Sequence, residues 1–571
     1  MQERIRKAIT EALETLGMSG VDFSVEHPGE LEHGDYASNV AMVVAKQAGE
    51  NPRECALRIL AELEKHKPAE VEKVEIAGPG FINFHLSRTF FSDQVKEVLD
   101  KRDDWGKNNT LAGKRVMVEY TDPNPFKVFH IGHLMTNIIG ESIACLSEFG
   151  GAEVKRANYY GDVGIHIAKA IWGMLETKSQ MPKDDAPLAV KTKYLGDAYA
   201  LGSKRFDEDK AVGEEIKTLN KKIYERSDEA INALYDAGKQ WSLDHFETIY
   251  QTLGTRFDFY FPESEVGGLG QEVVRKNLGP IFEESDGAVV FHAEKHDDKL
   301  HTRVFLNSQG LPTYEAKELA LAKIKYDHYP YDLSVIVTAN EIEVYFKVLI
   351  AAMNLVFPEL APKTLHKPHG MLRLPTGKMS SRTGNIITGE SLLNDSIALA
   401  ESKMQEAGRN LGDEREKVAV TVGVGALKYA ILKQAIGKNI IYDAEKSFSF
   451  EGDSGPYLQY THARIASILR KAEAEGVVPS ATIAPGGIST VEHVLNRFSF
   501  AIKRAQTEYE PHYVVTYLTE LAGAFNSWYA QEQIVNKEDK YSPYKVAVAQ
   551  AVAQTLKNGL WCLGIKAPEK M

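Results

Sequence analysis

The segment from residue 114 to residue 160 constrains the fold more than any other part of this chain. Arg115–Tyr120 is a short run rich in apolar and β-branched residues, and a proline-bearing loop follows it. A stretch with helical spacing covers Ile131–Phe149, and Glu153–Tyr159 is again typical of a strand. Strand, loop, helix and strand in this order predict the start of a parallel α/β sheet, to which a buried-type strand at Leu333–Thr338 also fits.

Changes of pattern along the chain predict several domains. The first 88 residues combine helical spacing with two alternating runs around a Gly-Pro-Gly turn, which indicates a small α/β unit. The apolar runs after about residue 417 nearly all have helical spacing. The predicted division is a small domain at 1–88, a linker at 89–110 that begins as a helix, an α/β domain at 111–416 with an insertion around 172–300, and an all-α domain at 417–571.

Composition excludes several classes of protein. Three cysteines in 571 residues, far apart and in no CxxC pair, exclude a disulfide framework and a cysteine-rich zinc knuckle, and a reducing cytoplasm is expected. The longest apolar run, Val418–Leu427, is about half of a membrane-spanning helix, and the charged N-terminus is no secretory signal. A net charge of −12 argues against nonspecific coating of nucleic acid, but not against one shaped RNA on a local basic face.

The first chemical motif lies where the loop after the first strand enters the helix. His130 and His133 are three residues apart, on one face of the helix and near its positive end, and Gly132 between them lets a ligand approach the backbone. This arrangement suits the triphosphate and ribose of ATP, with imidazole N–H groups supporting a pentacoordinate phosphate. In isolation, two structural histidines or half of a metal site would be alternative interpretations, although no third ligand is nearby.

The second motif is a glycine-bounded loop from Gly370 to Asn385 that contains Lys378-Met379-Ser380-Ser381-Arg382. It is not a Walker loop, because the glycine spacing is wrong and Met379 replaces the Ser/Thr. A cationic, hydroxyl-rich loop can move over a triphosphate and neutralise the departing phosphates. Taken alone, it could also be an ordinary solvated basic loop.

Together, the two motifs resemble the paired HIGH and KMSKS signatures of class I aminoacyl-tRNA synthetases. The flanking sequence Glu-Tyr-Thr-Asp-Pro-Asn, with Lys127 before His-Ile-Gly-His, resembles the arginyl-tRNA synthetase family. Segments 33–41, 77–84, 450–464 and 563–571 resemble the same family, so the resemblance covers nearly the whole chain. It implies a Rossmann-type catalytic domain, a tRNA-elbow-binding domain at 1–88 and an anticodon-binding domain at 417–571.

The resemblance also implies an activity, its substrates and its site residues. L-arginine and ATP, with Mg²⁺, would give arginyl-adenylate and pyrophosphate, and arginine would pass to the terminal adenosine of tRNA(Arg). The implied catalytic residues are His130, His133, Lys127 and Lys378. The implied ATP contacts are His130, Gly132, His133, Lys378, Ser380, Ser381 and Arg382. The implied arginine contacts are Glu119, Asn124, Tyr314, Glu318, Glu341, Asp162 and His166. No metal-ligating residues and no structural zinc are expected.

Two features depart from the family pattern. The second lysine of KMSKS is replaced by Ser381, and Lys127 stands where members lacking that lysine tend to carry one. Glu318 and Glu341 stand where many members carry Asp and Gln, although extra acids still favour a cationic substrate.

The tRNA-reading residues are implied more loosely, because aromatics at helical spacing are as often core residues. Aromatic and amide side chains suit stacking on unpaired bases. The implied contacts are Phe81, Asn83, Tyr457, Tyr460, His462, Arg464, Phe525, Asn526, Trp528 and Tyr529. A cytoplasmic monomer without membrane association is expected. The alternatives are a class I synthetase for another amino acid and a catalytically silent tRNA-binding paralogue, although this chain keeps both motifs.

Overall fold

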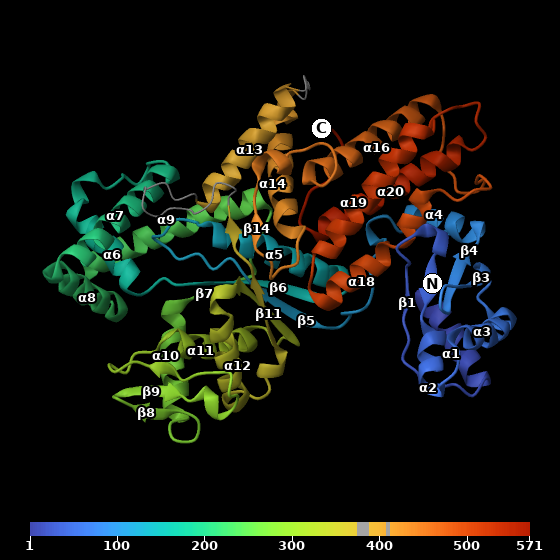
Figure 1. Ribbon diagram of the computed structural model, residues 1–571. Coiled ribbons are helices and arrows are strands. Elements are labelled where there is room, and N and C mark those ends of the chain that lie inside the picture. Colours follow the sequence, from blue (N-terminus) through green and yellow to red (C-terminus); the bar gives the residue numbers. More distant parts are fainter. Residues whose placement is uncertain (374–387, 407–411) are drawn as a thin grey trace.

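The computed structural model describes residues 1–373, 388–406 and 412–571, so the predicted phosphate loop at 378–382 lies outside the described residues. Its centre is a parallel sheet of five strands in the order β12-β11-β5-β6-β7 (Figure 1). The strands are β5 Arg115–Glu119, β6 Glu153–Tyr160, β7 Phe259–Pro262, β11 Leu333–Ala339 and β12 Thr364–His369. The chain runs outward from β5 through β6 to β7, then returns to the other side of β5. Such a reversal opens a ligand crevice at the carboxyl ends of the strands, so the predicted Rossmann-type sheet is confirmed.

Helices on both faces explain why the three central residues of β5 are apolar. Val116, Met117 and Val118 have no exposed surface, as expected for a central parallel strand that helices cover on both sides. The helices of this region are α5 Ile131–Phe149, α6 Ile165–Glu176, α7 Leu188–Glu208, α8 Lys210–Glu225, α9 Glu229–Leu253, α10 Glu263–Lys276, α11 Tyr314–His328, α12 Glu343–Val356 and α13 Gly389–Glu406. A small antiparallel sheet contains β8 Glu283–Ser285, β9 Ala288–Phe291 and β10 Arg303–Leu306.

The N-terminal unit is a four-stranded antiparallel sheet, in the order β1-β2-β4-β3, packed against helices. Its elements are α1 Gln2–Thr15, β1 Val25–Glu26, β2 Tyr36–Ser38, α2 Val40–Ala48, α3 Pro52–His66, β3 Val71–Ala77 and β4 Phe81–Leu86. Helical spacing in the sequence extends from Ala37 to Ala48, but α2 begins only at Val40, because residues 36–38 pair with β4. Asn51 caps the next helix, and its Oδ1 accepts the Arg53 N–H at 2.8 Å.

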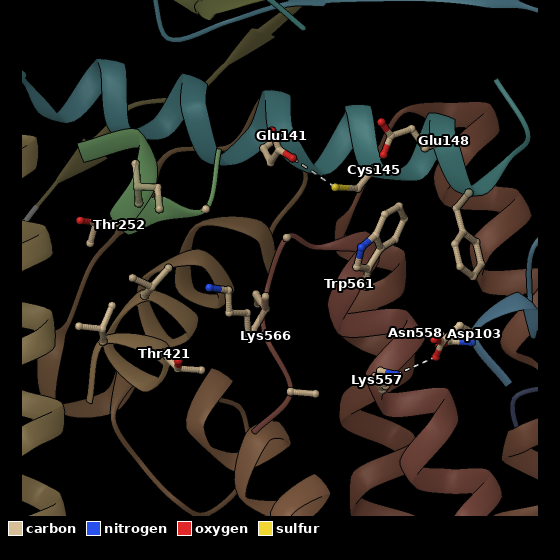
Figure 2. Close-up of a pocket in the computed structure, with 18 of the residues that line it drawn as sticks. Asp103, Glu141, Cys145, Glu148, Thr252, Thr421, Lys557, Asn558, Trp561 and Lys566 are labelled. Carbon is tan, nitrogen blue, oxygen red and sulfur yellow. Dashed lines mark hydrogen bonds and ion pairs between the residues drawn. The ribbon is translucent and has the colours of Figure 1, made fainter. Parts of the chain in front are cut away.

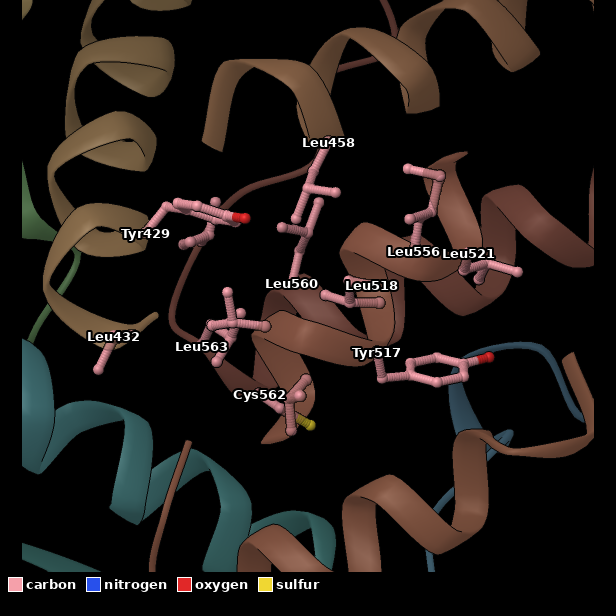
Figure 3. Packing of buried hydrophobic residues seen from close by; sticks show 14 of the residues in the cluster. Tyr429, Leu432, Leu458, Tyr517, Leu518, Leu521, Leu556, Leu560, Cys562 and Leu563 are labelled. Carbon is pink, nitrogen blue, oxygen red and sulfur yellow. The ribbon is translucent and has the colours of Figure 1, made fainter. Parts of the chain in front are cut away.

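The C-terminal quarter is helical, as predicted, and α20 runs through its core. Its elements are α14 Arg415–Leu432, α15 Ala444–Ser447, α16 Gly455–Glu475, α17 Thr490–Asn496, α18 Phe498–Glu508, α19 His512–Gln531 and α20 Ser542–Cys562, and a short pair is formed by β13 Leu372–Arg373 and β14 Ile440–Ile441. Figure 3 shows Leu556 and Leu560 of α20 among Leu458 of α16 and Leu518 of α19.

The helix expected at the start of segment 89–110 is present, and the segment is docked onto the C-terminal helices. In α4 (Arg88–Lys101), Gln94 donates to Asn496 at 3.1 Å, and after the helix the indole N–H of Trp105 donates to Thr555 at 3.1 Å. The polar composition of residues 89–110 therefore reflects contacts with the C-terminal helices and not a free connection. The N-terminal unit lies beside those helices, and α6–α8 lie at the opposite end of the molecule (Figure 1).

The long helix α5 connects the crevice with the C-terminal helices. It begins beside the carboxyl end of β5, and its second half packs against α18 and α20. Ser142 donates to the Cys562 carbonyl at 2.9 Å, and the Gln506 amide donates to the Leu146 carbonyl at 3.0 Å. Among the described residues, no helix combines the length and apolar character needed to cross a bilayer.

Candidate active site

The loop from β5 to α5 has a strained backbone that its surroundings hold in place. Thr121, Asp122 and Phe126 have φ values of 82°, 48° and 64°, in a region that non-glycine residues rarely adopt. Hydrogen bonds connect Asp122 and Phe126 to other elements. The Tyr159 N–H donates to Asp122 at 2.9 Å, and the Phe126 N–H donates to Ser242 Oγ at 2.9 Å. Strain of this kind is typical of functional loops that neighbouring structure holds in one conformation.

Hydrogen bonds between the two motif histidines determine their tautomers. The His133 N–H donates to His130 Nδ1 at 3.3 Å, and the His130 N–H donates to His133 Nδ1 at 3.2 Å, so each ring caps the helix start. Burial, then the positive charge of Lys127, lowers the pKa of His130; burial, then the charges of His130 and Lys127, lowers that of His133 well below its ordinary value. Two neutral rings with Nδ1 as acceptor carry their proton on Nε2. Both therefore present an N–H donor.

Gly132 is required by the packing of these rings. The two imidazoles stack with centroids 3.4 Å apart, and a Cβ at Gly132 would lie 2.9 Å from His130 Cε1. Any side chain there would push the His130 ring out of its capping position. The close approach of a ligand to the backbone, expected from the sequence, is thus not the only reason for a glycine.

Lys127 influences every histidine of the site. Its positive charge helps to lower the pKa of His130, His133 and His166, after burial as the main cause, and burial lowers its own pKa. Lys127 lines a cavity of about 260 Å³ together with Phe129, Thr388 and Glu390.

The start of α13 lies on the histidine motif. The Gly389 N–H donates to the Phe129 carbonyl at 2.8 Å, and His130 forms a backbone bridge with Thr388. The chain that follows the predicted phosphate loop is therefore anchored at His130.

An acidic pocket lies at the carboxyl ends of the strands next to this loop. Glu119 accepts a hydrogen bond at 2.6 Å from Lys325, and both side chains are about 1–2% exposed. Glu263, the residue after β7, is paired with Lys317 in the same way. Glu318 forms no hydrogen bond within the described part of the chain, and burial, reinforced by the charge of Glu119, raises its pKa to about 8.

Two buried hydroxyl groups in this pocket also have no hydrogen-bond partner among the described residues. They belong to Tyr159, at the end of β6, and Tyr345, on α12. After burial, the negative charge of Glu318 contributes most to the raised pKa of both. Unpaired buried polar groups cost free energy, so a polar ligand that paired with them would recover it.

The other predicted arginine contacts are placed differently. Asp162 is fully buried and accepts hydrogen bonds from Tyr235, Lys239 and Ser264, which tie the loop after β6 to α9 and α10. Asn124 accepts the Gly161 N–H at 3.0 Å, and His166 donates to the Gly161 carbonyl at 3.0 Å.

Two predicted pocket residues lie toward solvent. Tyr314, the first residue of α11, is 63% exposed, with the Lys317 ammonium 5.5 Å from its ring centroid. Glu341 is exposed at the end of β11, in the short 3₁₀ helix Asn340–Ile342, and pairs with no other described residue. The structure thus brings Glu119 and Glu318 together, holds Asn124 on the loop after β6, and leaves Tyr314 and Glu341 exposed.

Sequence reasoning missed Glu263, Lys317, Lys325, Tyr159 and Tyr345. The signal for Glu263 and Tyr159 was available, because both stand at the carboxyl end of a strand, where parallel sheets place ligands. The two lysines and Tyr345 lie on helices, and only the fold turns them toward the pocket.

The predicted tRNA contacts divide into surface and core residues. Phe81 is 39% exposed and Asn83 is buried on β4, while Phe525 and His462 lie in the core of the C-terminal helices. The Arg464 guanidinium lies 4.7 Å from the Tyr460 ring centroid. The remaining members of that group are Tyr457, Asn526, Trp528 and Tyr529, of which Asn526 accepts from Arg464 at 2.6 Å and donates to Tyr457 at 3.0 Å.

A larger cavity of about 850 Å³ lies at the other end of α5 and contains none of the predicted site residues. Figure 2 shows Glu141, Trp561 and Lys566 around it. Its acidic groups are already paired, Glu141 with Arg156 and Asp103 with Lys557. Size alone therefore does not identify the active site. The described residues include no group of three or more His, Cys, Asp or Glu side chains that could hold a metal ion.

Comparison with known proteins agrees with this site. Family models match at residues 3–86 (arginyl tRNA synthetase N terminal domain), 94–444 (tRNA synthetases class I (R), catalytic domain) and 458–571 (DALR anticodon binding domain). The chain is 30% identical to the arginine–tRNA ligase of Clostridium perfringens, over 100% of this chain and 99% of that protein. It is 29% identical to that of Thermococcus kodakarensis, with the same coverage.

Solved structures give the same fold. Thermus thermophilus arginyl-tRNA synthetase superimposes with a TM-score of 0.81 at 23% identity, and each chain is covered completely. The structure from Plasmodium falciparum gives 0.79 at 18% identity, over 100% of this chain and 99% of that chain. At these identities the structures support the fold, and the family models and sequence relatives support the family. The chain is a class I aminoacyl-tRNA synthetase and belongs to the arginyl-tRNA synthetase family.

Proposed function

We propose that this chain activates L-arginine with ATP and transfers it to the terminal adenosine of tRNA(Arg). The observation that carries the proposal is the pair of neutral imidazoles, each with an Nε2–H donor, at the start of α5 beside an acidic pocket. The pocket suits a guanidinium, and the two donors suit a phosphate.

In the first step, a carboxylate oxygen of arginine attacks the α-phosphate of ATP, and the bond to pyrophosphate breaks. Negative charge grows on the phosphate oxygens and on the leaving pyrophosphate. The N–H donors of His130 and His133 stabilise the charge on the α-phosphate oxygens, because the capping bonds already orient both rings. Lys127 would supply the cation that the position of Ser381 lacks.

The second step transfers arginine from the adenylate to a hydroxyl of the tRNA terminal adenosine, and AMP leaves. Mg²⁺ enters with the phosphates of ATP as part of that substrate. Lys378, Ser380 and Arg382 would cover the phosphates from the segment that ends at Thr388.

The N-terminal and C-terminal domains supply the tRNA contacts in this proposal. Exposed Phe81 suits stacking on an unpaired base of the tRNA elbow. Arg464, Tyr460 and Tyr529 form a cation–aromatic surface, with the guanidinium 4.7 Å and 5.7 Å from the two ring centroids, that suits splayed anticodon bases. The protein would act as a monomer in the cytoplasm.

The experiment is aminoacylation of total tRNA with labelled arginine by the full chain. Charging of arginine-accepting tRNA is expected. Charging with another amino acid would make the chain a synthetase of different specificity, and tRNA binding without any charging would make it a silent paralogue.

A further inference from the structure

A buried polar stripe runs along α5, the helix that begins with the two motif histidines. His133, Asn137 and Glu141 are spaced four residues apart and therefore lie on one face of the helix. They are 7%, 0% and 6% exposed, and most of the helix around them is apolar. In the proposed function His133 contacts phosphate, whereas Asn137 and Glu141 have no role. The inference that follows rests on that proposed function.

Both ends of the Asn137 amide are bonded to threonine hydroxyls. Its Nδ2 donates to Thr121 Oγ1 at 3.0 Å, and its Oδ1 accepts from Thr255 Oγ1 at 2.9 Å. Thr121 lies in the loop after β5, and Thr255 lies between α9 and β7. All three residues are buried, so bulk water cannot replace either bond. Asn137 therefore connects α5 to the loop after β5 and to the end of α9.

The bond from Asn137 reaches the strained backbone at the start of the loop. Thr121 has a φ of 82°, and Asp122 has a φ of 48°. The left-handed region is especially unfavourable for a β-branched residue such as threonine. Such a conformation persists only where surrounding contacts hold it. The bond from Asn137 holds the Thr121 side chain, and the Tyr159 N–H holds Asp122 at 2.9 Å.

The residue before Thr121 is also held against α5. Gly140 lies so close to Tyr120 that a Cβ at this glycine would be 2.2 Å from the Tyr120 Cγ atom. The Tyr120 hydroxyl donates to Glu141, which also accepts the Arg156 Nε–H at 3.0 Å. Consecutive loop residues are thus bonded at successive turns of α5. These bonds fix the position of the helix along its own axis relative to the loop.

We propose that Asn137 is a positioning residue for amino-acid activation: by holding Thr121 in its left-handed conformation against α5, it fixes the arginine pocket relative to the phosphate donors at the start of that helix. Glu119 of the pocket lies two residues before Thr121, and His133 lies one helical turn before Asn137. The bond between Asn137 and Thr121 therefore connects the two halves of the site. Because both ends of its amide are occupied, Asn137 acts through the loop and not through contact with substrate.

This role predicts a loss of rate and not of binding. Activation requires the carboxylate of arginine to meet the α-phosphate of ATP, and a displacement of about 1 Å can cost about 100-fold in rate. Each substrate is still bound by its own half of the site, so its KM changes little. Asn137→Ala should therefore lower kcat about 100-fold, with the KM values for arginine and ATP within about threefold of those of the unmodified protein.

The test is arginine-dependent ATP–pyrophosphate exchange by the full chain with tRNA present. Thr121→Val keeps the volume and the branched Cβ but removes the hydroxyl, so it should lose kcat as Asn137→Ala does. Thr121→Ser keeps the hydroxyl that accepts from Asn137, and its kcat should stay within about threefold of that of the unmodified protein. Asn137→Ala combined with Thr121→Val should be no slower than either single variant, because all three lack the same bond.

Asn558→Ala is the matched control for the loss of a buried amide. Asn558 on α20 is 4% exposed and donates to the carbonyls of Arg102 and Trp105, both at 2.9 Å. It lines the cavity at the other end of α5. Asn558→Ala should lower the free energy of unfolding in denaturant titration, as Asn137→Ala should, but it should leave kcat within about threefold.

Three results would overturn the proposal: a kcat of Asn137→Ala within threefold of the unmodified protein, a Thr121→Ser variant as slow as Thr121→Val, or an equal loss of kcat in Asn558→Ala. If Asn137→Ala does not fold, the two Thr121 variants decide. If the unmodified chain exchanges with a different amino acid, the proposed specificity fails, and the same variants are compared with that amino acid. Exchange with no amino acid would overturn the proposed function, and this role with it.

Discussion

The substitution His133→Ala tests the chemistry of the motif most closely. His133 is 7% exposed, and its Nδ1 accepts the His130 N–H at 3.2 Å, so its Nε2–H is the donor toward the crevice. Loss of one oriented donor costs about 2–4 kcal/mol of transition-state stabilisation, which is about a 30-fold to 1,000-fold fall in the rate of activation. Loss of the cap costs about 0.5–2 kcal/mol of stability.

The assay is arginine-dependent ATP–pyrophosphate exchange with cognate tRNA present, since members of this family usually need tRNA bound before they form the adenylate. The rate should fall while the KM for arginine changes little, because the lost contact is made to phosphate. His366→Ala is the matched control: His366 is a half-buried histidine of β12, bonded to Thr338 at 2.7 Å and stacked on Phe346 of α12. Activity of His133→Ala within about threefold of the unmodified protein would refute the assignment.

Three further substitutions give distinct outcomes. Lys127→Ala should abolish exchange nearly as fully as loss of His133, and adding Ser381→Lys should recover part of it; near-normal exchange by the single variant would show a solvated lysine. Glu341→Gln should raise the KM for arginine with little change in ATP affinity, and an unchanged KM would place Glu341 outside the pocket. Lys428→Met leaves two helix-end carbonyls unpaired, which its ammonium now binds at 2.6 Å and 2.7 Å, and should lower the free energy of unfolding by about 2–4 kcal/mol in denaturant titration; a loss below 1 kcal/mol would contradict that.

Local patterns predicted the elements that hold the histidine motif. The helix Ile131–Phe149 and the strands on either side of it were predicted nearly to the residue, because periodicity and the proline-bearing loop agree there. The strand at 36–38 was missed, since its pairing with β4 lies more than 40 residues away in the sequence. The docked helix α4 was interpreted as partly linker because its partners are side chains of α17 and α20.

The candidate site was predicted only where it lies in motifs. The family resemblance implied that Glu119 and Glu318 contact arginine, but nothing in the sequence indicates that Lys325 turns inward to pair with Glu119. A lysine on a helix is usually a solvated residue, and its burial depends on a carboxylate that is 206 positions away. The pairing of Glu263 with Lys317 could not be predicted for the same reason, because the two residues are 54 positions apart. Charge balance in a buried pocket is a property of the fold.

The central claim is that the neutral histidine pair and the acidic pocket together activate arginine. The most direct measurement is ATP–pyrophosphate exchange by the full chain with each of the twenty amino acids in turn, with total tRNA present. We expect exchange with arginine and background rates with the other nineteen, lysine included, because one carboxylate and two hydroxyls suit a planar guanidinium better than a compact ammonium. Exchange with a different amino acid, or with none while tRNA still binds, would contradict the account.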